Sequence, residues 1–218
     1  MNAQGKLDSR RTLFYDVDTQ RDFMLPGGAL YVPGSEKILP ALKELTELAR
    51  RRKIRRLCSM DRHFKGDREL ARNGGPWPDH CMDGTPGQRK VEETALLNPL
   101  SIPSQKIDDD RLETAVHDSG ELVLEKQDVD VLAGNANARS VFSKLLNIYQ
   151  DVVIYGVYTD VCVDCAVGAV LEQGVKPYVV IDAIHEIDPA KAASVRQRWN
   201  RCEVKTISLK ELHDLLAD

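Results

Sequence analysis

The chain has 218 residues, of which 42% are hydrophobic, and it carries a formal net charge of -4. This length and apolar content suffice for one full core, so we expect a single domain over residues 1–218 with a flexible lead over residues 1–11. The acidic balance argues against binding of nucleic acid or of a membrane surface, since such surfaces need a basic excess.

Short apolar runs that are typical of buried strands alternate with amphipathic segments along the chain. The predicted strands are residues 12–18, 54–60, 121–125, 152–157, 177–182 and 204–207. The predicted helices are residues 35–53, with Ser35 as N-cap, then 136–149, 161–172, 189–199 and a last one from residue 209. This alternation predicts an α/β fold in which helices cover both faces of a mainly parallel sheet.

The absence of two sequence features and the number of cysteines indicate the cellular compartment. No apolar run approaches the length of a membrane span, and the N-terminal lead lacks the apolar segment of a signal peptide. Five cysteines, an odd number, fit reduced thiols better than a disulfide framework. We therefore expect a cytoplasmic protein.

A long connection without clear periodicity spans residues 61–102. Loops of this length inside a compact domain are usually functional or disordered. This one contains Trp77, His80, Cys81 and Met82, residue types that favour a function.

Polar residues gather where the predicted strands end. Asp18 ends the first strand, Asp61 and His63 end the second, Lys126 ends the third, and Cys162 follows the fourth. The carboxyl ends of parallel strands meet at one edge of a sheet, and ligands bind there. We therefore expect these five side chains to lie close together.

Cys162 falls between a strand and a helix. Unpaired N–H groups and the helix dipole at such a junction lower the pKa of a thiol, although a buried packing cysteine would have the same local sequence. Asp18 and Lys126 supply a base and an orienting charge. The three residues therefore suit nucleophilic catalysis.

A second set of residues suits a divalent transition metal. Asp61 and His63 lie two positions apart on an extended backbone, and His80 is a third candidate ligand. Two histidines and a carboxylate leave positions open for water or substrate. Cys81, beside His80, could compete as a ligand.

An alternative interpretation is that Cys162 and Cys165 act together as a CxxC motif. This spacing occurs in thiol–disulfide proteins and in half-sites for zinc. The motif lies late in the chain and has no proline or glycine between its cysteines. It also leaves Asp18, Asp61 and the two histidines unexplained.

Five ordered motifs resemble those of the isochorismatase-like cysteine hydrolases, in particular the nicotinamidase/pyrazinamidase branch. The resemblance covers residues 12–182, most of the chain. The motifs are VDTQRDF from residue 17, PGGAL and VPG from residues 26 and 32, DRH from residue 61, WPDHCMDGTPG from residue 77, and GVYTDVCV from residue 156.

The resemblance implies a three-layer αβα sandwich and a thioester mechanism that cleaves nicotinamide to nicotinate and ammonia. It also implies a catalytic triad of Asp18, Lys126 and Cys162, and one metal ion, Zn or else Fe or Mn, on Asp61, His63 and His80. The implied oxyanion hole consists of the backbone N–H groups of Tyr158 and Cys162, with a cis peptide bond between Val157 and Tyr158. Phe23 and Trp77 are implied to contact the substrate ring.

The chain also departs from the family pattern. The context of Lys126 lacks the usual KG, and Tyr158 replaces a residue that is commonly small. Another small amide or carbamoyl compound therefore stays open as substrate. A water-activating metallohydrolase, a thiol-redox protein and a non-catalytic binding protein are the alternatives of other classes. We expect a small-molecule partner and a homo-oligomer.

Overall fold

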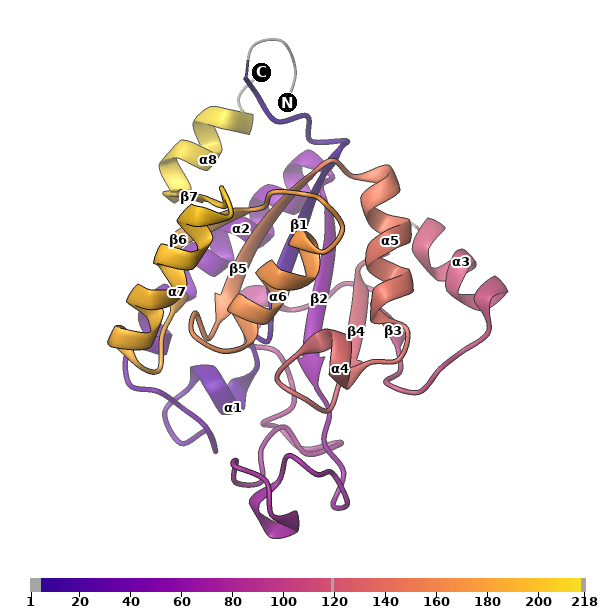
Figure 1. The fold of residues 1–218 in the computed structure, drawn as a ribbon, viewed down its shortest axis with the longest axis vertical. Helices are drawn as coiled ribbons and strands as arrows, with labels where there is room; N and C mark the ends of the chain where they lie inside the picture. Colours follow the sequence, from indigo (N-terminus) through magenta and orange to yellow (C-terminus); the bar gives the residue numbers. More distant parts are fainter. Residues whose placement is uncertain (1–4, 119, 217–218) are drawn as a thin grey trace.

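A seven-stranded sheet forms the centre of the computed structural model, which describes residues 5–118 and 120–216 (Figure 1). All neighbouring strands are parallel, in the order β3-β4-β2-β1-β5-β6-β7. This confirms the predicted α/β fold. The strands are β1 (Thr12–Val17), β2 (Arg55–Asp61), β3 (Leu100–Ile102), β4 (Leu122–Lys126), β5 (Asp151–Val157), β6 (Tyr178–His185) and β7 (Lys205–Ile207).

Helices cover both faces of the sheet, which confirms the three-layer arrangement. One apolar core lies between the sheet and the helices α3, α5, α6 and α7, and a second core lies beneath α2 and α8. Every residue of β1 and β5 is buried, as expected for central strands that are covered on both faces. The helices are α1 (Arg21–Met24), α2 (Leu39–Arg52), α3 (Asp109–His117), α4 (Val131–Gly134), α5 (Ala138–Ile148), α6 (Cys162–Leu171), α7 (Pro189–Arg201) and α8 (Leu209–Leu216).

The strand order places a topological switch point between β1 and β5. From β1 the chain builds one half of the sheet with β2, β4 and β3, and it then returns to add β5, β6 and β7 on the other side. Ligands of open α/β sheets bind at the carboxyl ends of the strands beside such a point. Asp18 directly follows β1, and Cys162 begins the helix after β5.

Gly156 permits the close approach of these two strands. Its φ angle is +126°, and a Cβ atom at this position would collide with the carbonyl oxygen of Val17 on β1. Only glycine adopts this backbone conformation without strain and leaves the necessary space.

Four helices or strands were not predicted from the sequence, namely the short helices α1 and α4, the strand β3 and the helix α3. The edge strand β3 lies at the end of the predicted long connection, and α3 follows in a segment for which no helix was predicted. β3 has only three residues, too few for an alternating pattern to be recognised. The side chain of Asp108 caps α3 by accepting a hydrogen bond from the N–H of Arg111.

Ser35 is not the N-cap of a helix, so this prediction was wrong. Residues Ser35–Ile38 form a 3-10 turn ahead of α2, and the Ser35 hydroxyl donates to the Val32 carbonyl oxygen at 2.6 Å. Of the predicted flexible lead, residues 1–4 lie outside the described residues. Leu7 is buried, and its N–H donates to the Leu215 carbonyl oxygen at 2.9 Å. No helix within residues 5–118 or 120–216 is long and apolar enough to cross a membrane.

Candidate active site

Asp18, Lys126 and Cys162 meet at the carboxyl edge of the sheet. Lys126 Nζ lies 3.1 Å from Asp18 Oδ2 and 3.8 Å from Cys162 Sγ. The three come from the ends of β1 and β4 and from the first residue of α6, and all are buried. A thiol, a carboxylate and an ammonium group thus share one buried site.

Burial dominates the electrostatics of this group. It raises the pKa of the Cys162 thiol well above its usual value, although Lys126 acts in the opposite direction. It also raises the pKa of Asp18, against the lowering effect of Lys126. The expectation that the start of a helix lowers the pKa of Cys162 is therefore wrong, because desolvation of the thiolate outweighs the favourable charges. The Cys162 side chain is therefore a thiol at neutral pH, and a reaction at its sulfur would need a neighbouring base to take the proton.

Lys126 connects this group to a second carboxylate. Its ammonium group forms a hydrogen-bonded ion pair with Asp61 and also donates to the carbonyl oxygen of Asp128 at 3.0 Å. Burial alone would lower the pKa of Lys126, but Asp18 and Asp61 raise it well above its usual value. Lys126 therefore carries a stable positive charge between two carboxylates.

Asp61, His63 and His80 form a buried cluster whose potential ligand atoms all lie within 4.8 Å of one another. Asp61 Oδ2 is 3.8 Å from His63 Nε2 and 3.4 Å from His80 Nε2. His63 Nε2 has no hydrogen-bond partner, which is costly for a buried polar atom. Two imidazoles and a carboxylate match the ligands that zinc and similar ions prefer, so the residues present fit a divalent metal.

The Nδ1 atoms of both histidines contact oxygen atoms that do not belong to this cluster. His63 Nδ1 lies 3.1 Å from Asp67 Oδ2, and His80 Nδ1 lies 2.8 Å from the carbonyl oxygen of Pro78. Such contacts fix the ring orientation and place the proton on Nδ1, which leaves Nε2 as a lone-pair donor. Both Nε2 atoms face Asp61.

Glu69 is a further acidic residue at this site that the sequence did not indicate. Its Oε2 approaches His63 Nε2 at 3.4 Å, but Glu69 does not belong to the compact cluster of ligand atoms. Burial and the neighbouring Asp61 carboxylate raise the pKa of Glu69. No local signal in the sequence identifies it, because it lies in the long connection without periodicity.

Gln20 and Asp22 position the site without belonging to it. The Gln20 side chain donates to the Asp61 carbonyl oxygen at 2.8 Å and accepts from the Asp61 N–H at 2.7 Å. Asp22 Oδ2 accepts from the N–H of Cys81 at 2.7 Å, which holds the loop that carries His80.

The alternatives that involve cysteines gain no support. Among the described residues, Cys81 is not part of the compact ligand cluster, and its Sγ points toward the Gly87 carbonyl oxygen at 3.9 Å. Cys162 and Cys165 are both free thiols. Burial, together with nearby carboxylates, raises the pKa of Cys165 to about 11, so it holds little thiolate at neutral pH.

A cavity of about 220 Å³ opens beside Cys162. Asp61 and His80 line one part of it, and apolar side chains supply most of the remaining wall. The aromatic and aliphatic residues that line it include Phe23, Leu30, Val32, Trp77, Val129, Tyr158, Val161 and Ile187. A small and largely apolar molecule matches this space.

Tyr158 fixes one wall of the cavity. The peptide bond that precedes it is cis, as predicted. Its hydroxyl donates to the carbonyl oxygens of Phe23 and Leu30, the latter at 3.0 Å, and it accepts from the N–H of Val32 at 3.1 Å. One buried phenol thus ties the loop between α1 and α2 to the segment that follows β5.

We expect the substitution Tyr158→Phe to lower the free energy of unfolding by about 1–3 kcal/mol, because it leaves the main-chain groups of Phe23, Leu30 and Val32 without their partner. Denaturant unfolding measures this loss, and hydrogen exchange should show faster exchange in residues 24–34. Tyr31→Phe is the matched control, since that phenol donates to the Glu36 carboxylate near the surface. Equal losses in the two variants would show that Tyr158 does not hold the loop.

No protein-family model and no curated protein matched the sequence. Solved structures matched it over nearly the whole chain. The pyrazinamidase of Pyrococcus horikoshii in complex with zinc has 24% sequence identity and a TM-score of 0.70, over 91% of this chain and 99% of the other. PnC1 from L. infantum in complex with nicotinate has 18% identity and a TM-score of 0.74, over 95% and 96% of the two chains.

An isochorismatase family protein from Desulfovibrio vulgaris is similar as well. It has 21% identity and a TM-score of 0.72, over 96% of this chain and 100% of the other. The chain therefore has the isochorismatase-like α/β fold.

Proposed function

We propose that the protein is an amidohydrolase that cleaves nicotinamide to nicotinate and ammonia through a thioester on Cys162. One observation carries this proposal: a buried group of Asp18, Lys126 and Cys162 adjoins both an aromatic-lined cavity and a cluster that can hold a metal. The solved structures of similar fold include a zinc-bound pyrazinamidase and a nicotinate complex, which supports the same chemistry.

The first half of the proposed reaction forms the acyl-enzyme. Asp18 takes the proton of the Cys162 thiol, and the sulfur attacks the carboxamide carbon. The carbonyl oxygen becomes an oxyanion, which the backbone N–H groups of Tyr158 and Cys162 stabilise. Cys162 lies in the first turn of α6, where backbone N–H groups have no acceptor within the helix. Asp18 then gives its proton to the leaving nitrogen, so that ammonia departs and a thioester remains.

The second half consumes one water molecule. Asp18, again a carboxylate, takes a proton from water, and the resulting hydroxide attacks the thioester carbon. The C–S bond breaks, the acid is released, and the proton returns to the sulfur of Cys162. Lys126 keeps Asp18 in place and balances its negative charge throughout.

Asp61, His63 and His80 would hold the metal, which we propose is Zn, with Fe or Mn as alternatives. When bound, the metal supplies a coordination position for the pyridine nitrogen and so orients the amide toward Cys162. Phe23 and Trp77 line the same cavity and would contact the ring faces.

Release of ammonia tests this proposal. Purified protein should release ammonia from nicotinamide and from pyrazinamide faster than from aliphatic amides of similar size. If no aryl carboxamide is hydrolysed, the nicotinamidase proposal fails. Turnover of aliphatic amides or carbamoyl compounds alone would assign the protein to another hydrolase activity on the same fold.

Metal content gives an independent prediction. We expect about one zinc ion per chain in protein purified without chelator, and at least about 100-fold weaker binding in the His80→Ala variant, which loses one of three ligands. Elemental analysis and titration with zinc measure both quantities. His117→Ala is the control, because His117 is exposed and pairs with Glu113. Equal zinc affinity in both variants would remove the proposed site.

A further inference from the structure

Ile187 is a large apolar residue at the mouth of the cavity beside Cys162, which we call the reaction cavity. It is 39% exposed, and it lines this cavity together with buried residues such as Phe23 and Tyr158. The other large apolar residues that are exposed in the described part of the chain do not line it; they are Phe64, Leu97, Leu100, Ile148 and Ile181. A ligand that covers an apolar side chain at the mouth removes it from water, which favours binding.

The loop that carries Ile187 is fixed to the segment between β5 and α6. In that segment, Asp160 accepts hydrogen bonds from the N–H of Ile187 at 2.8 Å and from the N–H of Asp188 at 3.1 Å. The N–H of Thr159 donates to the carbonyl oxygen of His185 at 2.7 Å. Main-chain groups on both sides of the loop between β6 and α7 are thus bonded to the same segment. Ile187 therefore has a defined position relative to the start of α6, where the nucleophile lies.

The residues on either side of Ile187 also hold the loop to α7. The side chain of Asp188 accepts from the N–H of Ala190 at 2.8 Å and so caps this helix. Glu186 forms an ion pair with Arg196 at 2.8 Å. A loop that is held on both sides does not yield easily to a larger ligand, so its side chain can discriminate ligands by their size.

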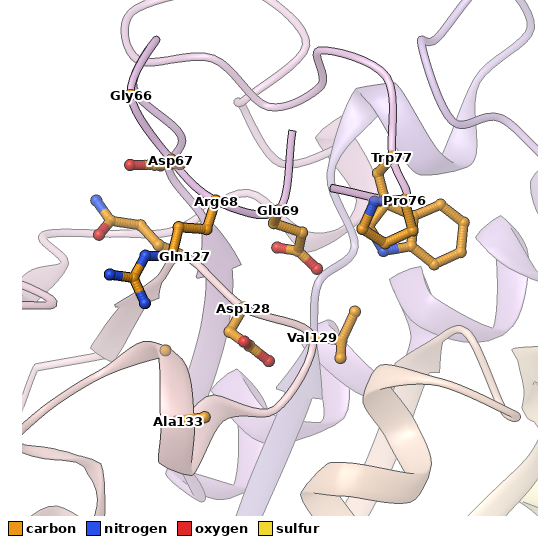
Figure 2. Close-up of a pocket in the computed structure, with 11 residues that line it drawn as sticks. Gly66, Asp67, Arg68, Glu69, Pro76, Trp77, Gln127, Asp128, Val129 and Ala133 are labelled. Carbon is orange, nitrogen blue, oxygen red and sulfur yellow. The ribbon is translucent and has the colours of Figure 1, made fainter. Parts of the chain in front are cut away.

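Another part of the cavity wall is less restrictive. Glu69, Trp77 and Val129 line both the reaction cavity and an open cleft of about 560 Å³, so the two spaces adjoin at these side chains (Figure 2). Ile187 does not line the cleft. The reaction cavity has about 220 Å³, less than the roughly 300–1,000 Å³ of typical ligand sites. A ring substituent can therefore extend toward the cleft, whereas it collides with the wall at Ile187.

We propose that Ile187 is a specificity-determining residue of the reaction cavity and that Asp160 positions it. The inference rests on the proposed amidohydrolase function and narrows it to amides without a bulky substituent on the ring edge that faces Ile187. In the proposed complex Phe23 and Trp77 contact the ring faces, while the amide and the ring nitrogen point inward. The outer edge of the ring is left for Ile187, which covers it by apolar contact and excludes larger groups there.

A panel of ring amides tests the role of Ile187. The probes are nicotinamide and nicotinamides that carry one ethyl group, placed on each free ring carbon in turn. Ile187→Ala should lower kcat/KM for nicotinamide several-fold, mainly through KM, because contact with the ring is lost. For at least one ethyl position, kcat/KM relative to nicotinamide should rise by about tenfold or more.

Ile148→Ala is the matched control for this panel, since Ile148 is 37% exposed and does not line the cavity. We expect it to leave the relative values of kcat/KM unchanged. If no ethyl position gains in Ile187→Ala, or if Ile148→Ala gives the same gain, Ile187 does not determine specificity.

Variants of Asp160 test its positioning role. Asp160→Ala should give a gain for the same ethyl position, and Asp160→Asn, which keeps one of the two acceptor oxygens, should give a smaller gain. The ratio to nicotinamide cancels any general loss of activity. Because Asp160 acts through Ile187, the double variant Asp160→Ala/Ile187→Ala should gain no more than Ile187→Ala alone. Additive gains would contradict this role.

Asp108→Ala is the matched control for Asp160, since Asp108 also accepts from a main-chain N–H, at the start of α3 and outside the cavity lining. We expect a loss of stability without a change in the relative values of kcat/KM. If Asp160→Ala behaves in the same way, Asp160 is a structural residue only.

Binding measurements separate this inference from the proposed reaction. Calorimetry with the Cys162→Ala protein gives the affinities for nicotinamide and the ethyl compounds without turnover. If the wild type cleaves no ring amide, yet Ile187→Ala in this background shifts the relative affinities by about tenfold, the role of Ile187 holds and the proposed reaction fails. If nicotinamide is cleaved but neither relative rates nor relative affinities change, the reaction holds and the role of Ile187 fails. Absence of binding of every ring compound would overturn that role as well.

Discussion

Substitution of Cys162 by alanine is expected to lower amide turnover by at least about 10⁴-fold, because loss of the nucleophile in a triad leaves only binding and oxyanion stabilisation. The side chain is 8% exposed, and alanine removes only the sulfur atom, so the fold should persist. Single-turnover measurements of ammonia release check the activity. Circular dichroism and thermal unfolding check the fold.

The Cys165→Ala variant is the matched control for this experiment. Cys165 lies one helical turn further along α6 and is a free thiol like Cys162. We expect nearly unchanged turnover, since no residue of the candidate triad depends on it. Retained turnover in Cys162→Ala would replace the thioester mechanism by direct attack of an activated water. Loss in both variants would revive a function for the CxxC pair.

The residues at the strand ends could be predicted, because the alternation of apolar runs and amphipathic segments shows where each strand ends. In a parallel sheet all carboxyl ends lie on one edge, so residues at or just beyond the ends of β1, β4 and β5 must meet there. Asp18, Lys126 and Cys162 are such residues, and the structure brings them together. Their catalytic roles come from the resemblance to a known family and stay predictions.

The electrostatics of the same residues could not be predicted locally. The sequence around Cys162 shows the start of a helix, which favours a thiolate, but it does not show how much protein covers the sulfur. Burial reverses the direction of the expected pKa shift. This difference matters for the proposed mechanism, in which Asp18 removes the proton of the thiol before attack.

The structure of the long connection between β2 and β4 could not be predicted from the sequence. It has no hydrophobic period, since the contacts that hold it are side-chain hydrogen bonds with distant segments, such as that of Asp22 with the Cys81 N–H. Such contacts leave no pattern in a single sequence. The place of Glu69 beside His63 therefore could not be predicted from the sequence.

Substitution of Lys126 by methionine is expected to impair both stability and turnover. The ammonium group lies between Asp18 and Asp61, and all three side chains are at most 4% exposed. Removing it leaves two buried carboxylates facing one another without a counter-charge, which typically costs about 3–5 kcal/mol. Denaturant unfolding of the metal-free protein measures this loss. Turnover should fall as well, because Asp18 loses the charge that orients it.

The loss of stability should depend on pH in a defined direction. Burial already raises the pKa of Asp18, and loss of Lys126, whose charge acts to lower it, should raise the folded-state pKa of Asp18 further above its unfolded value. A group of this kind destabilises the folded state as pH rises through its folded pKa. The deficit of Lys126→Met relative to wild type should therefore be largest at neutral pH and shrink on acidification.

Lys90→Met is the matched control, because it removes another buried lysine that is paired with an aspartate. Lys90 Nζ lies 3.1 Å from Asp16 Oδ1, but Asp16 keeps Arg56 as a partner at 2.8 Å. We therefore expect a smaller loss, of about 1–2 kcal/mol, and intact turnover. If Lys126→Met destabilises no more than Lys90→Met and still hydrolyses amides, Lys126 is a structural residue. A larger loss that shrinks at low pH, together with failed turnover, assigns it to the reaction centre, because only the pair of carboxylates at that site explains both effects.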